Sequence, residues 1–154
     1  MQVQLDPTFT LDSERHALIG RSPAGEIFFR TDESGLHVNI YSFTVRGESY
    51  SADGQYGSDG ALQVYDVRKT DWTAARREGS KATCKLIREE VLRLFGLARD
   101  SGHLGKLERA SEEWRMRDAL QRLERERAEL QQRLKELSAE HTAISARLTA
   151  QGVQ

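Results

Sequence analysis

The chain has 154 residues, 38% of them hydrophobic and 31% charged, with a formal net charge of -1 at pH 7. This length allows one compact domain with an appendage but excludes two full domains. Charged residues exceed the roughly 25% usual in globular chains, which is typical of long solvated helices.

The single cysteine, Cys84, excludes an intrachain disulfide framework and any multi-cysteine zinc site. The first twenty residues lack the basic start and apolar core of a signal peptide, and no apolar run approaches the roughly 18 residues of a membrane helix. We therefore expect a soluble, unprocessed protein of the cytoplasm or another reducing intracellular compartment, or a component of a virion.

The first part of the chain, residues 1–67, is rich in β-branched and aromatic residues punctuated by turn residues, which predicts a mostly antiparallel sheet. Residues 26–30, 31–35 and 36–45 read as strand, turn and strand, with Gly35 in the turn. Within residues 36–45 the apolar phase changes parity after Ile40, which predicts a bulge or burial on both faces.

Residues 46–60 are predicted to form a loop, because glycines and short polar residues dominate and Tyr50 and Tyr56 are the only large anchors. A strand is expected to follow at residues 62–67.

A helix is predicted over about residues 71–99, with Asp71 as a candidate cap and an interruption at Gly79 and Ser80. Its apolar side chains recur at three- and four-residue spacings, which favours packing on the sheet; they are Cys84, Ile87, Val91, Leu94, Phe95 and Ala98. Leu86, Leu92 and Leu97 lie off this face, so we expect cover from more than one side, by the domain or by a second copy. Cys84 is interpreted as a core residue and not as a nucleophile.

Two glycines predict a break at residues 101–105, after which residues 106–150 contain neither glycine nor proline. This last segment carries a heptad pattern with a frame slip between Trp114 and Met116. The positions expected to mediate oligomerisation are Met116, Leu120, Leu123, Arg127, Leu130, Leu134, Leu137, His141, Ile144 and Leu148.

A helix of this length spans roughly 60 to 70 Å, and its leucine stripe requires partner helices, because an isolated helix leaves the stripe in water. No second heptad segment of comparable length is present to form a hairpin within the chain. We therefore predict self-association as a dimer or trimer, with the polar positions Arg127 and His141 fixing register and copy number. The irregular piece from Leu107 to Trp114 is expected to pack partly on the preceding domain.

Local signatures of catalysis are missing from the sequence. There is no phosphate-binding glycine loop, no nucleophile elbow and no pair of histidines at metal-ligand spacing, since His16, His37, His103 and His141 are scattered. We predict no enzymatic activity, no cofactor and no metal.

A second function class, nucleic-acid binding, is indicated by basic residues at helical spacing that would form one stripe able to contact phosphates. The basic set comprises Arg76, Arg77, Lys81, Lys85 and Arg88, of which the last four recur at helical spacing and form the stripe. The strand aromatics Phe28, Phe29, Tyr41, Phe43 and Tyr65 could add stacking platforms for bases, although strand aromatics are usually core. The acidic first half of the same domain offers Glu and Asp residues that could neutralise the stripe instead, internally or across an interface.

The sequence as a whole predicts an α+β protein with three parts: a β-rich head at residues 1–100, a break at 101–105 and a coiled-coil stalk at 106–150. This order of parts resembles that of centriolar and other head-and-stalk proteins and of some phage fibre and accessory proteins. The resemblance is one of layout and extends to no individual residues. The expected role is assembly, in which the stalk sets copy number and the head, with Tyr50 and Tyr56, presents a surface to another protein in a larger complex. No membrane partner is expected.

Overall fold

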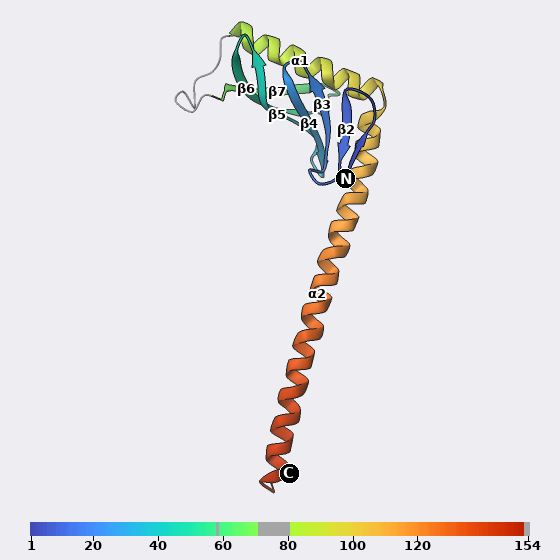
Figure 1. Ribbon diagram of the computed structural model, residues 1–154, viewed down its shortest axis with the longest axis vertical. Coiled ribbons are helices and arrows are strands. Elements are labelled where there is room, and N and C mark those ends of the chain that lie inside the picture. The colour runs from blue at the N-terminus through green and yellow to red at the C-terminus, as the bar shows by residue number, and fades with distance from the viewer. Residues whose placement is uncertain (58, 71–80, 153–154) are drawn as a thin grey trace. The chain divides into compact units, whose positions relative to one another are not determined.

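The computed structural model of the chain describes residues 1–57, 59–70 and 81–152. The chain divides into two compact units, Met1–Trp114 and Arg115–Gln154, which we call the head unit and the stalk unit. The head unit contains one seven-stranded antiparallel sheet and the helix that follows it, while the final long helix begins in the head unit and supplies the stalk unit. The predicted α+β fold class is confirmed (Figure 1).

The sheet is a simple meander, in which every strand pairs antiparallel with its neighbour in sequence. Its strands are β1 (Gln2–Gln4), β2 (Phe9–Asp12), β3 (Ala17–Ser22), β4 (Gly25–Asp32), β5 (Gly35–Val45), β6 (Glu48–Tyr56) and β7 (Leu62–Lys69). The helices are α1 (Lys81–Asp100) and α2 (His103–Ala150).

The core of the head unit lies between one face of the sheet and α1. Alternate strand residues such as Ile27, Phe29 and Val38 are fully buried there, as the two-residue period of a strand requires. The helix contributes every side chain predicted for its apolar face, from Cys84 to Ala98. That prediction, and the interpretation of Cys84 as a core residue, are confirmed.

The predicted hairpin is present as β4 and β5. Asp32 pairs with Gly35 at its end, Gly35 has a φ of 112°, and the backbone N–H of Ser34 donates to Asp32 Oδ1 over 2.8 Å. The predicted change of phase in the second strand is also confirmed, because the register of β5 against β6 shifts between Ile40 and Phe43.

The prediction of a loop at residues 46–60 is wrong for most of its length, because residues 48–56 form β6 between β5 and β7. The inward positions of β6 are Tyr50, Ala52 and Gly54, and all three are buried. Little space is left at Gly54, where an added Cβ would lie 3.2 Å from the carbonyl oxygen of Gln63. Because two of the three inward positions carry small residues, the strand has no strong hydrophobic alternation, and its composition is typical of a loop.

The two helices meet at a shorter break than predicted. Gly102 has a φ of 78°, and its N–H donates to the carbonyl oxygen of Arg99 over 3.1 Å, which ends α1. Because α2 already begins at His103, Gly105 lies within it, where an added Cβ would meet only the end of the Arg109 side chain. The predicted cap at Asp71 and the interruption at residues 79–80 lie outside the described residues.

The first turns of α2 belong to the head unit. Leu107 is fully buried and joins the main core with Trp114, as expected for the irregular piece before the heptads. The Trp114 ring stacks on His16, with ring centroids 5.3 Å apart and an interplanar angle of 14°. The head unit therefore includes part of the last helix.

A partly buried polar pair also joins the start of α2 to the N-terminal strands. The Nε2 atom of the buried His103 is hydrogen-bonded to the Asp6 carboxylate, which also accepts the backbone N–H groups of Thr8 and Phe9 over 2.7 and 2.8 Å. Burial raises the pKa of the Asp6 carboxyl, but the hydrogen bonds from His103, Phe9 and Thr8 together outweigh it. The pKa of Asp6 therefore lies below its usual value of 3.8.

We expect Asp6→Asn to weaken the acid sensitivity of the head unit. A carboxyl whose pKa is lowered by folding stabilises the folded state above its unfolded pKa and loses this contribution as the pH falls through the folded pKa. The parent chain should therefore lose stability below about pH 4, whereas Asp6→Asn should be less stable at neutral pH and show a flatter acid limb. Urea unfolding at a series of pH values gives the free energy of unfolding of each protein. If this free energy falls equally steeply with pH below pH 4 in both proteins, the prediction is contradicted.

Candidate self-association surface

The distal part of α2 carries a stripe of exposed apolar side chains, which we call the heptad stripe. Its eight apolar members keep between 43% (Leu148) and 71% (Leu130) of their surface exposed. They are Met116, Leu120, Leu123, Leu130, Leu134, Leu137, Ile144 and Leu148. In the described chain, residues 120–150 are exposed throughout.

The helix positions these side chains through its own period. Spacings of alternately three and four residues keep them on one side of a helix that turns every 3.6 residues. Polar side chains on the other faces bond within the helix, as when Arg133 Nη1 approaches Glu136 Oε2 at 3.4 Å and the Thr142 hydroxyl donates to the Ser138 carbonyl oxygen over 2.9 Å. The polar faces are thus suited to water and the stripe to another helix.

Two members of the predicted set are polar. Arg127 and His141 occupy the same heptad position as Leu120, Leu134 and Leu148, and both are exposed. In a coiled coil such residues would lie at the interface, where polar side chains restrict register and copy number.

The described part of the predicted basic stripe lies along α1. Lys81, Lys85 and Arg88 are exposed, and Lys85 Nζ lies 3.9 Å from Glu89 Oε1. Among the described residues no ion pair involves Lys81 or Arg88. Arg76 and Arg77 lie outside the described residues, so the structure brings together three of the five predicted cations.

Most of the strand aromatics proposed as stacking platforms are core residues. Phe29 and Phe43 are fully buried in the main core, and Phe28 is buried in a smaller cluster with Ala17 and Ile19. Stacking of bases on these three rings is therefore excluded. Tyr41 and Tyr65 remain exposed, at 57% and 43%.

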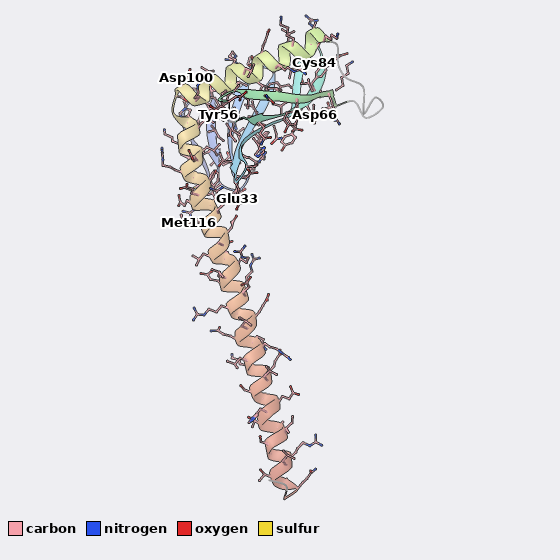
Figure 2. All side chains as sticks on the ribbon, turned by 180° about the vertical axis from the view of Figure 1, so that it is seen from behind. Glu33, Tyr56, Asp66, Cys84, Asp100 and Met116 are labelled. Carbon is pink, nitrogen blue, oxygen red and sulfur yellow. The ribbon has the colours of Figure 1, made fainter. Side chains whose placement is uncertain are left out.

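The two tyrosines expected to form a binding surface differ in burial. Tyr50 is fully buried, with its hydroxyl donating to Glu48 Oε2 over 2.7 Å, so its predicted role in a binding surface is wrong. Tyr56 is 38% exposed and packs on Phe95 with ring centroids 5.6 Å apart. Figure 2 shows Tyr56 toward the Asp100 end of α1 and away from the Cys84 end.

Tyr56 lines a shallow apolar hollow of about 150 Å³, which we call the Tyr56 pocket. The Arg99 guanidinium carbon lies 5.6 Å from the centroid of the Phe95 ring and so places a cation at the pocket. The lining residues are Leu36, Tyr56, Phe95, Arg99 and Leu104. Sequence reasoning found only Tyr56 as a binding residue, because the other four come from three further elements, β5, α1 and α2, that only the fold brings together.

Sequence reasoning also missed a cluster on the sheet face opposite α1. The guanidinium carbons of Arg15 and Arg30 lie 5.8 and 5.3 Å from the centroid of the Phe28 ring. Arg30 Nη1 also donates to the Tyr41 hydroxyl oxygen over 3.3 Å. The only signal in the sequence was the alternation of Phe28 with Arg30 along β4, which did not identify the neighbours.

Within residues 1–57, 59–70 and 81–152, no helix is both long enough and apolar enough to cross a bilayer. The same residues contain no group of three or more side chains placed to hold a metal ion. Comparison with protein-family models, curated proteins and solved structures finds no match.

Proposed function

We propose that this protein is an oligomeric assembly protein. In this proposal the stalk unit sets the copy number, and the head unit presents a binding surface in a larger complex, as in a head-and-stalk scaffold or a phage-type structural accessory protein. The observation that carries the proposal is the heptad stripe, eight large apolar side chains exposed along one side of a helix.

The energetics of exposure support association. Burying a leucine or isoleucine side chain completely is worth roughly 1.5 to 3 kcal/mol, and the stripe leaves about half of this unrealised at each position. Summed over the stripe, the missing stabilisation exceeds what helix propensity alone supplies in water. Partner helices recover it, and a second copy of the same stripe has matching spacing.

The test is the mass of the purified full chain in solution, by sedimentation equilibrium or light scattering at tens of micromolar. A dimer or trimer with helix content matching α2 is expected. A monomer whose distal helix is fully formed would contradict the proposal, because it would show that the stripe needs no partner.

The polar heptad positions give a further prediction. Replacing Arg127 and His141 together by leucine should stabilise the oligomer and relax its copy number, since polar residues at single core positions specify register at a cost in stability. We expect the melting temperature to rise, and the mass distribution to broaden or shift to higher order. Replacing the exposed neighbours Ala128 and Thr142 by leucine provides a matched control, and an equal effect there would contradict the assignment.

For the head unit, the Tyr56 pocket is the feature best suited to receive another protein. Its apolar walls fit one aliphatic or aromatic side chain, and Arg99 adds a cation at the same place. Titration with a small aromatic such as indole, followed by NMR, should shift the amides of Leu36 and Leu104. Unchanged amide shifts at millimolar indole would contradict this role.

The alternative function is nucleic-acid binding through α1, favoured by the exposure of Lys81 and Arg88 without an ion pair among the described residues. Oligomerisation would multiply the cations and add avidity. Replacing Lys81, Lys85 and Arg88 by glutamine should then lower affinity for a labelled oligonucleotide and reduce the salt dependence of binding. No binding by the parent chain at low salt would end this alternative.

A further inference from the structure

One flank of α1 carries a ridge of four residues, Leu86, Glu90, Arg93 and Leu97, spaced four, three and four residues apart. This spacing aligns them along one side of a helix, beside the buried face that runs from Cys84 to Ala98. Leu86 and Leu97 keep 39% and 45% of their surface exposed, the Arg93 side chain keeps 52%, and the Glu90 side chain keeps 26%. Figure 2 shows side chains extending outward along α1 between Cys84 and Asp100.

This ridge reads apolar, acidic, basic, apolar, and it is its own complement in the antiparallel direction. If a second α1 lies antiparallel, with the two-fold axis midway between Glu90 and Arg93, Leu86 of each copy faces Leu97 of the other. The same rotation places Glu90 of each copy opposite Arg93 of the other. At the ends of the ridge the small exposed residues Ala82 and Ser101 face each other.

We propose that the α1 ridge is a second self-association surface, which binds a second copy of this chain through an antiparallel, two-fold pairing of α1 with α1. A two-fold interface uses the same patch on both subunits, so the patch must be self-complementary. Both the apolar and the charged positions of the ridge meet this requirement.

The charged pair is already organised for such a contact. Arg93 Nη2 lies 2.5 Å from Glu90 Oε1 within one helix, and Arg93 Nε donates to Glu90 Oε2 over 3.0 Å. A carboxylate has further acceptor sites and a guanidinium has further donors, so two such pairs can join into a network of four charges across the axis. A partner of a different sequence would need the inverse order of charges, which a second copy supplies without change.

The pairing does not depend on the heptad stripe. One pair of twenty-residue helices buries less than the roughly 1,200 Å² of a standard stable interface, so the contact is weak by itself. If the stalk unit also associates, α1 pairing within one oligomer is favoured by the high effective concentration of the second ridge. Pairing between oligomers would instead link them into larger assemblies.

The test uses the full chain with Leu130, Leu134 and Leu137 replaced by serine, so that the heptad stripe does not contribute, and with Cys84→Ala to remove the native thiol. Two such proteins, one with Leu86→Cys and one with Leu97→Cys, are mixed and treated with a short bismaleimide. Cross-links between the two proteins should exceed those within either protein alone by at least fivefold. Cross-links between two copies of the same protein should be rare, because in this pairing a cysteine lies about 16 Å along the helix axis from the same cysteine of the other copy. Equal yields, or no cross-links at millimolar protein, would overturn the proposal.

Charge variants in the same background test the electrostatic part. When both cysteine proteins carry Glu90→Arg, or both carry Arg93→Glu, cross-linking should fall at least fivefold, because like charges then meet across the two-fold axis. Mixing the Glu90→Arg form of one cysteine protein with the Arg93→Glu form of the other should restore cross-linking. Placing both substitutions in both proteins should also restore it. Glu33→Arg, in an exposed turn, serves as control. Failure of the mixture to recover, with circular dichroism unchanged, would overturn the proposal, and the mass of the parent chain reports separately on the heptad stripe.

Discussion

Replacement of Leu130, Leu134 and Leu137 by serine is expected to convert the oligomer to monomers at tens of micromolar and to unfold most of residues 115–150. Each leucine buried between helices contributes roughly 2 kcal/mol or more, so three replacements per copy should raise the dissociation constant by at least a thousandfold. The distal helix should unfold with dissociation, because an isolated helix in water is marginal. Light scattering and circular dichroism on the same sample measure the two effects.

The matched control for this variant replaces Glu129, Gln132 and Lys135 by serine. These residues lie in the same turns of α2, are also exposed and have helix propensities close to that of leucine, but they lie off the heptad stripe. The control should keep its mass and lose only a small part of its helix content. If both variants dissociate alike, helix propensity and not the stripe is responsible, and the proposed function fails.

Replacement of Leu107 by alanine is expected to destabilise the head unit by about 2 to 5 kcal/mol, the usual cost of removing a fully buried leucine side chain. Such a loss is a large part of the stability of a small domain. It should lower the midpoint of guanidinium unfolding, measured by tryptophan fluorescence, because Trp114 lies in the same core.

Leu120→Ala is the control for this second prediction. Leu120 lies on the same helix and is 57% exposed, so its replacement should leave the unfolding of the head unit within about 0.5 kcal/mol of the parent. It should instead weaken association through the heptad stripe. Equal destabilisation of the head unit by both variants would contradict the boundary at Trp114.

The elements that could be predicted from the sequence are those whose apolar side chains follow a clear period. The β4–β5 hairpin and the buried face of α1 are of this kind, and even the bulge after Ile40 left a change of parity in the sequence. The strand β6 could not be predicted, because Ala52 and Gly54 fill inward positions that neighbouring strands leave small. Polar residues then dominate the composition of β6, although this strand pairs with β5 on one side and β7 on the other.

For the candidate sites, the type and spacing of the residues could be predicted from the sequence. Which of these side chains are buried within the chain itself could not. Leu107 and Leu120 lie on one helix, yet the first is fully buried and the second is exposed. Likewise, Tyr50 and Tyr56 looked equivalent as anchors, but one points into the core. The α1 ridge became apparent only once the buried face of the helix was known, because the ridge consists of side chains beside that face that the head unit leaves at least partly exposed.

The order of strands in the meander has a consequence for how the chain can fold during synthesis. Each strand pairs with the one made just before it, so the sheet closes only short loops and can form progressively from the N-terminus. The core is complete once Trp114 has been added, whereas the heptad stripe is synthesised afterwards. Domains fold in this direction on the ribosome. The segment proposed to associate is therefore synthesised last, after every residue that contributes to the core of the head unit.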